Sequence, residues 1–299
     1  MTLDVEVMIV SYASASVLAP CLRSIADTMP DACVAIREHA ADARELARLR
    51  DLAADAGVAT RIEHDPSNPG FGAGCNALAR GSSAGWFLFL NPDARVESWP
   101  FDLVPPTGPA VIGPQYTSDA ADHAGRSYRI RDEIGRSWFR RRGRAPEGRG
   151  FVSGAALLVD ADTFRAIDGF DEGFFLFYED IDFCLRANDR GVPTVVARTW
   201  RVRHDRGHST TTRWGDALRW SYESACRFHA GRGSPVWAYR WYVVADALLR
   251  TGVQLARGDR ATARAHAALA RRAFSDSARQ LWSRPRGRGR PSAAPARRS

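Results

Sequence analysis

Short runs of β-branched and apolar residues alternate with helix-like stretches along the first ninety residues of the chain. In the helix-like stretches apolar residues recur every three or four positions, whereas the short runs carry strand-forming residues. Strands that alternate with helices form a mostly parallel central sheet flanked by helices, so the pattern predicts the α/β class. The predicted strands span residues 5–10, 33–36, 60–63 and 86–90, and the predicted helices span residues 14–27 and 42–56.

The rest of the chain is less periodic until its last hundred residues. Prolines and glycines predict a connector over residues 105–115, and the Arg-rich segment 126–149 lacks a strong period, which predicts a surface loop. Regular secondary structure is expected over residues 151–167, where an apolar run is followed by an amphipathic stretch. We therefore expect an α/β domain over residues 1–210, a helical C-terminal region over 211–283, and a disordered Arg/Pro-rich tail over 284–299.

The positive charge of the chain is concentrated in two segments. All 42 basic residues are Arg, against 34 acidic residues, so Lys-based chemistry is excluded. Nine Arg fall in residues 126–149 and six in 284–299, which leaves the rest of the chain near neutral. A general nucleic-acid-binding surface needs basic residues across the folded body, so we expect no nucleic-acid partner.

Cysteine and hydropathy patterns bear on the cellular compartment. The five cysteines form no CxxC pair, which argues against a disulfide scaffold and favours a reducing compartment. No run of about 20 apolar residues is present, so no spanning helix is predicted. The first residues include Asp4 and Glu6, which are atypical of a secretory signal, and we expect a cytoplasmic protein.

Three segments carry side chains suited to chemistry. Asn91-Pro92-Asp93 follows the predicted strand 86–90, where a carboxylate either binds a divalent cation or belongs to an ordinary turn. The segment 169–186 sets five carboxylates among six aromatic residues, which favours a raised carboxyl pKa and general-base chemistry, or the charged first turn of a helix. His204 and His208 lie four apart, which suggests a metal or phosphate site or a structural role.

The glycines at 70, 72 and 74 are spaced two and two, and they follow a turn. A dinucleotide-binding fingerprint requires glycines spaced two and three directly after a first strand. The segment therefore does not indicate a Rossmann site.

Taken in order, these segments resemble the family 2 glycosyltransferases of the GT-A fold, especially the bacterial rhamnosyltransferase-like branch. The resemblance covers about residues 5–210. It is carried by Ile9-Val10-Ser11-Tyr12, Cys21-Leu22-Arg23-Ser24, the segment from Asn68 to Asn76, Asn91-Pro92-Asp93, the segment from Gly169 to Arg186, and Val202-Arg203-His204.

The resemblance implies an inverting glycosyltransferase that moves a sugar, with rhamnose as the family-level expectation, from a dTDP- or UDP-linked donor. The acceptor would be a hydroxyl of a glycan, a polyprenyl-linked lipid or a secondary metabolite. Asp93 and His204 would hold Mg²⁺ or Mn²⁺, and Asp180 would be the base, with Glu179 as the second candidate. The expected nucleotide-sugar-binding residues are Ser11, Tyr12, Glu38, Asn68, Gly70, Phe71, Asn76, Asn91 and Asp93, and the expected acceptor-binding residues are Gly154, Asp182 and Arg186.

Two departures from the family pattern affect the nucleotide base. The family usually has Asp-Asn-x-Ser-x-Asp after the second strand, where this chain has Glu38-His39-Ala40-Ala41-Asp42, and Ala13 replaces a usual Asn. The first Asp of that pattern commonly contacts the base, so the base preference stays open.

Three alternatives stay open at this stage. One alternative is a non-catalytic nucleotide-sugar-binding protein of the same fold. Another is a nucleotidyltransferase, in which the carboxylates of residues 169–186 would not serve glycosyl transfer. In the C-terminal helices, Trp237 and Trp241 either belong to a core or help the protein to dock on the inner face of an anionic membrane.

Overall fold

A computed structural model describes residues 3–101, 107–117, 124–125, 147–148, 150–204 and 213–282. The chain forms two compact units, Met1–Ser234 and Pro235–Ser299. The expected tail at 284–299 and most of the expected loop at 126–149 lie outside the described residues, as does His208.

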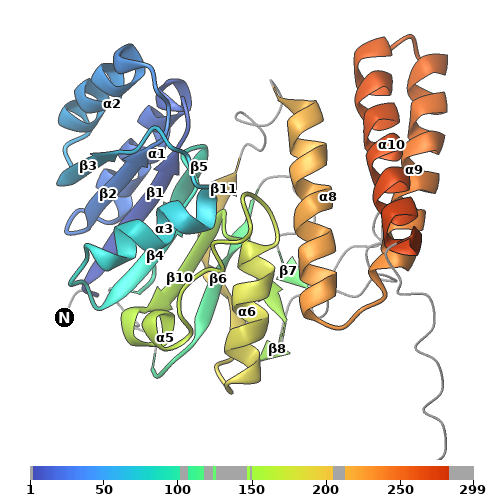
Figure 1. The fold of residues 1–299 in the computed structure, drawn as a ribbon. Coiled ribbons are helices and arrows are strands. Elements are labelled where there is room, and N and C mark those ends of the chain that lie inside the picture. The colour runs from blue at the N-terminus through green and yellow to red at the C-terminus, as the bar shows by residue number, and fades with distance from the viewer. Residues whose placement is uncertain are drawn as a thin grey trace, which may run out of the picture. The chain divides into compact units, whose positions relative to one another are not determined.

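A nine-stranded sheet organises the described part of the first unit, with the order β3-β2-β1-β4-β10-β6-β11-β5 and β8 paired to β11 (Figure 1). Strands β1 to β4, β6 and β11 run parallel, whereas β10, β5 and β8 run antiparallel to their neighbours. The prediction of a mostly parallel sheet is therefore confirmed. The strands of this sheet are β1 (Val5–Ser11), β2 (Cys33–Glu38), β3 (Thr60–His64), β4 (Trp86–Leu90), β5 (Ala94–Ser98), β6 (Val111–Tyr116), β8 (Glu147–Gly148), β10 (Ala156–Asp160) and β11 (Thr194–His204). A separate pair joins β7 (Ala124–Gly125) to β9 (Phe151–Val152).

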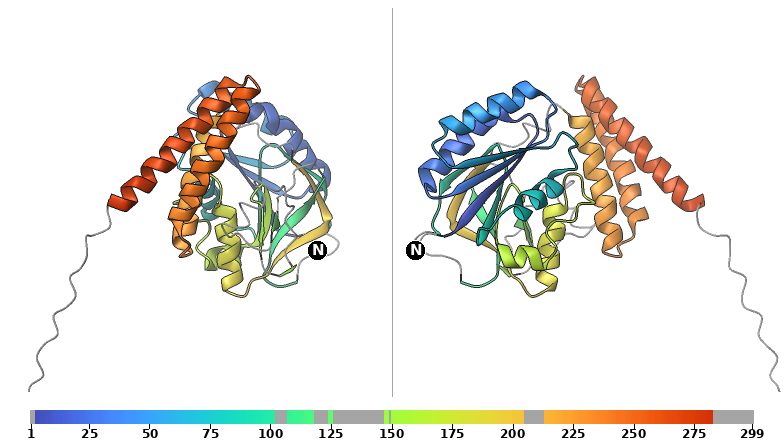
Figure 2. Two further views of the ribbon diagram at one scale, coloured as in Figure 1. Left: turned by 90° about the vertical axis from the view of Figure 1, so that its right-hand side faces the viewer. Right: turned by 60° about the vertical axis from the view of Figure 1, so that its left-hand side comes forward.

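Helices cover both faces of the sheet. Helices α1 (Ala15–Thr28) and α2 (Ala43–Asp55) lie on one face, and α3 (Phe71–Arg80), α5 (Ala161–Ala166) and α6 (Glu179–Asp189) lie on the other (Figure 1 and Figure 2). The central strands read as continuous apolar runs because both of their faces are buried.

The two faces have different cores. Aliphatic side chains of β1, β2 and β4 pack against α1 and α2. On the opposite face the rings of Phe89, Phe164, Phe170 and Phe183 pack with centroids between 5.0 and 5.4 Å apart for the closest pairs. This aromatic cluster fixes the start of α6 against the sheet, because Phe170 precedes the helix and Phe183 lies within it.

The structure contains several elements that the sequence did not predict. Helix α3 begins at Phe71, inside the glycine-rich segment, where no helix was predicted. The expected connector 105–115 contains β6, and β5 was not predicted. Short strands of this kind are specified by their neighbours in the sheet more than by their own sequence.

Helix α8 (Trp214–Gly231) closes the first unit, and the second unit contains α9 (Val236–Ala256) and α10 (Arg260–Trp282). The last two helices pair along their length as a hairpin (Figure 2). Among the described residues, no helix is both long enough and apolar enough to cross a bilayer.

Candidate active site

The carboxyl ends of the parallel strands gather most of the residues that the sequence singles out. Ser11 ends β1, Glu38 ends β2, Asn91 follows β4, and His204 ends β11. Gly154 lies just before β10, the antiparallel neighbour of β4, and so reaches the same edge. Open α/β sheets bind their ligands at this edge, because strand ends and loops converge there.

Asp93 and His204 are brought together by the pairing of β5 with β11. Asn91-Pro92-Asp93 turns the chain from β4 into β5, and Ala94 then pairs with His204. Asp93 Oδ1 lies 3.1 Å from His204 Nε2, and Asn91 Nδ2 lies 3.4 Å from the same nitrogen. A carboxylate oxygen and an imidazole nitrogen at this separation are suited to share one divalent cation.

Asp93 and His204 offer few ligands for a divalent metal ion that is bound by the protein alone. Within the described residues no group of three or more His, Cys, Asp and Glu side chains surrounds a common point. Two protein ligands agree with Mg²⁺ or Mn²⁺ chemistry at diphosphates, where substrate oxygens and waters complete the shell. The pair formed by Asp93 and His204 therefore fits a cation that binds together with a diphosphate.

Glu179 and Asp180 occupy the first turn of α6, after a strained entry. Phe177 and Tyr178 have φ values of 70° and 71°, in the left-handed region that non-glycine residues rarely adopt. Consecutive residues in this region cost free energy and persist where packing enforces them, often at functional sites. Here the buried Tyr178 ring packs on Phe228 of α8 with centroids 5.5 Å apart.

The two carboxyls differ in environment. Burial raises the pKa of Glu179 well above its ordinary value, and the neighbouring charge of Asp180 raises this pKa further. Burial also raises the pKa of Asp180, but backbone N–H groups oppose the shift. Gly154 N–H donates to Asp180 Oδ2 at 2.7 Å, and Ile181 N–H donates to Asp180 Oδ1 at 2.7 Å.

Asp180 remains half-buried, whereas Glu179 is only 5% exposed and its Oε2 has no hydrogen-bond partner among the described residues. Of the two carboxyls, Asp180 is therefore the better placed to meet a substrate hydroxyl. A raised pKa makes such a carboxylate a stronger base.

The glycine-rich segment packs against the segment that leads into α6. Phe71 N–H donates to Phe175 carbonyl oxygen at 2.9 Å. Gly70 has a φ of 110°, and a Cβ at this position would overlap the Phe175 carbonyl. Gly72 approaches Phe170 and Glu179 in the same way. These glycines are required for close packing, which accounts for their spacing without a phosphate.

Three of the expected ligand-binding side chains are engaged within the protein. Asn76 Nδ2 donates to Phe170 carbonyl oxygen at 2.8 Å, and its Oδ1 accepts from Phe170 N–H at 2.9 Å. Arg186 donates from Nε to Asp182 Oδ2 at 2.7 Å and from its Nη atoms to the carbonyl oxygens of Ile167 and Gly169. Asn76, Asp182 and Arg186 thus make contacts that hold the turn before α6.

Glu38 is likewise committed to the protein. Its side chain is fully buried; Oε2 accepts from Ser11 Oγ at 2.5 Å, and Oε1 accepts from the N–H groups of Ala13 and Ala40 at 3.1 and 2.6 Å. Glu38 therefore ties the loop after β1 to the loop after β2. Its expected contact with the nucleotide base does not fit this arrangement, because the carboxylate points into the protein.

An aromatic and cationic cluster at the start of α8 was not predicted. The Arg213 guanidinium lies 5.7 Å from the Tyr12 ring centroid and 5.0 Å from the Trp220 ring centroid. The Phe175 ring lies 4.8 Å from that of Trp220. Tyr12, which is 41% exposed, therefore belongs to a cluster that adjoins the segment before Glu179. Tyr12, Phe175 and the start of α8 are far apart in sequence, so no single motif connects them.

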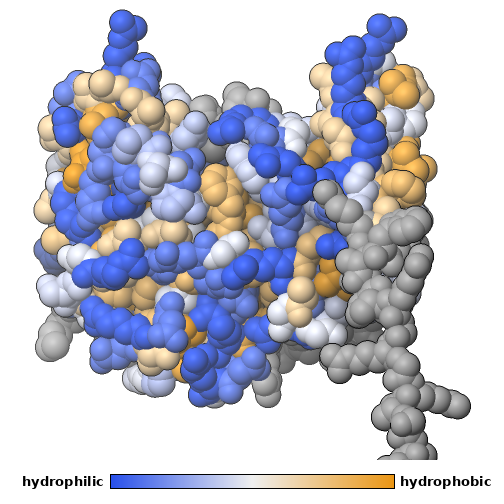
Figure 3. Space-filling model, viewed as in Figure 1, coloured by the Kyte–Doolittle hydropathy of each residue, from blue (hydrophilic) through white to orange (hydrophobic). Residues whose placement is uncertain are grey.

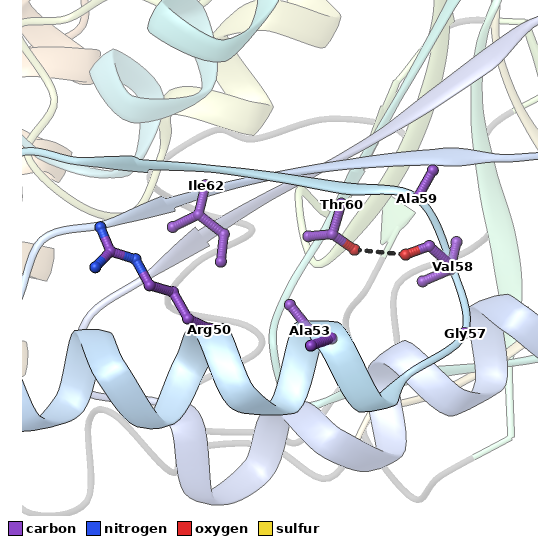
Figure 4. Close-up of a pocket in the computed structure, with 8 residues that line it drawn as sticks. Arg50, Ala53, Gly57, Val58, Ala59, Thr60 and Ile62 are labelled. Atoms are coloured by element: carbon purple, nitrogen blue, oxygen red, sulfur yellow. Dashed lines mark hydrogen bonds between the residues drawn. The ribbon is translucent and has the colours of Figure 1, made fainter.

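Two surface hollows lined by residues that the structure describes lie away from this site. One, of about 410 Å³, is bounded by α2 and the start of β3, where Arg50, Thr60 and Ile62 line it (Figure 4). Another, of about 620 Å³, is lined by Trp86 at the start of β4 and by Asp160 at the end of β10. Both hollows adjoin the amino ends of parallel strands, opposite the edge that carries Asp93 and Asp180.

Comparison with known proteins gives partial sequence matches. No family model matches the chain. Rhamnosyltransferase WbbL of Escherichia coli is 33% identical over 80 residues, which is 27% of this chain and 30% of that protein. The N-acetylglucosaminyl-diphospho-decaprenol L-rhamnosyltransferase of Mycobacterium tuberculosis is 33% identical over 104 residues, or 34% of each chain. The matches thus span about a third of these curated relatives.

The fold is similar to that of solved glycosyltransferases. The mannosyltransferase PcManGT from Pyrobaculum calidifontis, solved with GDP-Man and Mn²⁺, aligns with a TM-score of 0.55 at 14% identity, over 95% of this chain and 79% of that one. The chain therefore has the GT-A-like fold of these glycosyltransferases, and about a third of its length is similar in sequence to two proteins named as rhamnosyltransferases.

Proposed function

We propose that the chain is an inverting, metal-dependent glycosyltransferase that moves a sugar from a nucleotide diphosphate donor to a hydroxyl acceptor. One observation carries the proposal most directly. The pair formed by Asp93 and His204 lies at the same sheet edge as Gly154, whose N–H holds Asp180. A cation-binding pair and a base at one edge are what such a transfer requires.

The pair Asp93 and His204 would bind the donor through its diphosphate. A bound divalent cation supplies charge that neutralises the leaving diphosphate. Asp93 would contribute a carboxylate oxygen and His204 a ring nitrogen. Ligands fixed by sheet pairing need no rearrangement when the donor arrives, which favours catalysis by preorganised charge.

Asp180 would accept the proton of the acceptor hydroxyl. The acceptor oxygen forms a bond to the anomeric carbon of the donor while the bond from that carbon to the diphosphate oxygen breaks, and the hydroxyl proton passes to Asp180. Attack from the face opposite the leaving group inverts the configuration at carbon. The N–H groups of Gly154 and Ile181 hold the Asp180 carboxylate in place throughout.

Four further residues would position these groups. Asn76 and Arg186 fix the turn before α6 from two sides, and Glu38 fixes the loop that carries Tyr12. We assign these three residues positioning roles. Ser11 serves the same purpose through its hydrogen bond to Glu38.

The substrate class follows from the relatives. Both curated relatives are named as rhamnosyltransferases, and the name of the mycobacterial one includes a polyprenyl diphosphate acceptor. These names support rhamnose as the sugar and a lipid-linked hydroxyl as the acceptor. A dTDP- or UDP-linked donor is carried over from the sequence resemblance as part of the proposal. The manganese in the mannosyltransferase complex supports a divalent cation.

Product analysis by mass spectrometry tests the proposal. The full chain would be incubated with Mn²⁺ or Mg²⁺, a panel of dTDP-, UDP- and GDP-sugars, and polyprenyl-diphosphate-linked acceptors. We expect one donor to yield a glycosylated acceptor and free nucleoside diphosphate, with loss of both in Asp180→Asn. Asp162→Asn, which removes a fully exposed carboxylate of α5, is the matched control. Donor binding without product would favour the non-catalytic alternative. In a parallel incubation with nucleoside triphosphates and sugar 1-phosphates, formation of a nucleotide sugar with release of pyrophosphate would favour a nucleotidyltransferase.

A further inference from the structure

The hairpin formed by α9 and α10 carries most of the exposed large apolar side chains of the described residues. Nine such side chains are exposed, and seven of them belong to the hairpin: Trp237, Trp241, Leu248, Leu249, Val253, Leu255 and Phe274. Contiguous apolar surface of this kind is uncommon on monomeric proteins and marks interaction sites.

The contact between the two helices leaves most of this surface exposed. Helix α9 buries Tyr239, Val243 and Ala247, and the buried positions of α10 are mainly small. At 100° per residue, Trp237, Trp241, Leu248 and Leu255 lie within an arc of about 40° on a different side of α9. The hairpin is therefore packed internally and presents a second apolar stripe.

Arginines border this stripe on α10. The Trp241 and Phe274 rings pack with centroids 5.9 Å apart, which joins the stripe of α9 to one side of α10. Arg260, Arg264 and Arg271 fall within about 80° of Phe274 around the helix axis, and all three are exposed. Figure 3 shows hydrophobic residues along α9 at the right edge of the view, beside hydrophilic residues along α10.

The acidic side chains of this unit do not balance those arginines. Residues 235–282 contain eight Arg and three Asp. Asp246 pairs with Arg250 at 2.7 Å, and Asp276 pairs with Arg272 at 3.3 Å. Asp259 accepts from Thr262 N–H at the start of α10. The surface around the stripe is therefore positive.

We propose that the α9–α10 hairpin binds the surface of an anionic lipid bilayer, with Trp237, Trp241 and Leu248 in the headgroup region and the arginines of α10 against lipid phosphates. Tryptophan and leucine beside arginine are the composition of helices that lie in the membrane interface. Each basic residue near an anionic leaflet adds attraction that salt weakens. A second copy of the chain fits less well, because symmetric pairing would set arginines of one copy against those of the other.

Vesicle flotation with the full chain tests the proposal. The probes are vesicles of phosphatidylglycerol and cardiolipin in phosphatidylcholine, compared with phosphatidylcholine alone. We expect binding to the anionic vesicles that falls at least about tenfold in high salt. The triple variant Trp237→Ser, Trp241→Ser, Leu248→Ser should lose at least about tenfold in partitioning. The charge variant Arg260→Gln, Arg264→Gln, Arg271→Gln should also lose at least about tenfold in partitioning to the anionic vesicles.

The control variant places serine at the exposed Ala245 and Ala256 of the same helix, and it should partition like the unmodified protein. Equal binding of the triple variant, or no preference for anionic vesicles, would overturn the proposal. So would a lower melting temperature of the triple variant with unchanged flotation, because the stripe would then be buried by the protein itself. A concentration-dependent dimer that the triple variant abolishes, without vesicle binding, would assign the stripe to self-association. Transfer to a short-chain, water-soluble acceptor should be equal in all variants, which separates this test from that of the proposed function.

Discussion

Asp93 Oδ1 lies 3.1 Å from His204 Nε2, although 111 positions separate the two residues in the chain. The contact forms because β5 folds back from the end of β4 and pairs with β11, so that Ala94 faces His204. Sheet register thus sets the spacing between two potential cation ligands. A ligand pair held by register keeps its geometry without a bound ion.

Asp180→Asn should lower the rate of transfer by about 10²- to 10⁴-fold, because the amide cannot take the acceptor proton. The pH profile provides a second readout. Burial raises the pKa of Asp180, and the base works only when ionised, so kcat/KM of the unmodified enzyme should fall on acidification at a pH above the ordinary aspartate range. This acidic fall of kcat/KM should disappear in Asp180→Asn and persist in Glu179→Gln. Persistence in Asp180→Asn with loss in Glu179→Gln would assign the base to Glu179.

Glu179→Gln should change how stability depends on pH. The folded protein raises the pKa of Glu179 above its value in the unfolded chain, so the folded state binds this proton more tightly. The free energy of unfolding of the unmodified protein should therefore fall as pH rises from the ordinary glutamate pKa toward the raised one. Gln does not titrate, so the stability of the variant relative to the unmodified protein should grow across that window. Urea unfolding of both proteins from about pH 4 to about pH 8 measures this difference in the free energy of unfolding. A constant difference would contradict the assigned burial.

Asn76→Ala should destabilise the fold by about 2–4 kcal/mol, because it leaves the buried N–H and carbonyl of Phe170 without partners. Urea unfolding measures this cost. Arg80→Ala, which removes an exposed contact to Glu172, serves as the control and should change stability little. An unchanged stability with a weaker donor KM would instead make Asn76 a ligand for the nucleotide sugar.

Gly70→Ala should cost more than about 2 kcal/mol, because the new Cβ would overlap the Phe175 carbonyl in addition to adopting a φ of 110°. Gly191→Ala is the matched control, since Gly191 has a φ of 82° but nothing within 4 Å of the added carbon. Its cost should be near 1 kcal/mol, from the backbone conformation alone. Equal costs at both sites would show that the close approach to Phe175 is unimportant.

The sequence predicts the framework of the sheet because each central strand carries its own signal. Strand β4 is a continuous apolar run, and β1 is apolar apart from Glu6 and Ser11. The buried apolar residues of α1 and α2 recur at helical spacing. Strand β6 contains Gly113 and Pro114, which indicate a connector when judged alone. It forms because β10 and β11 supply partners on both sides. Such partners come from distant segments, so no local pattern reports them.

The sequence predicts which residues lie near the site better than it predicts what each of their side chains contacts. The sequence singles out Glu38, Asn76 and Arg186, and all three make several hydrogen bonds close to the site. Whether a side chain meets a ligand or a backbone amide depends on its direction after folding. Spacing does not encode that direction. The cluster of Tyr12, Arg213 and Trp220 shows the same limit, since its members meet only in three dimensions.

Metal-dependent binding of the donor nucleotide tests the central claim most directly. Thermal unfolding would be recorded with UDP, dTDP and GDP, each with and without Mn²⁺, for the unmodified protein, Asp93→Ala and the control Asp162→Asn. A nucleotide at about 100 times its Kd should stabilise the fold by about 2.7 kcal/mol. We predict a shift with one nucleotide that requires Mn²⁺, persists in the control and is lost in Asp93→Ala. No shift with any nucleotide, or an equal shift in Asp93→Ala, would contradict the assignment of Asp93 and His204 to the donor site.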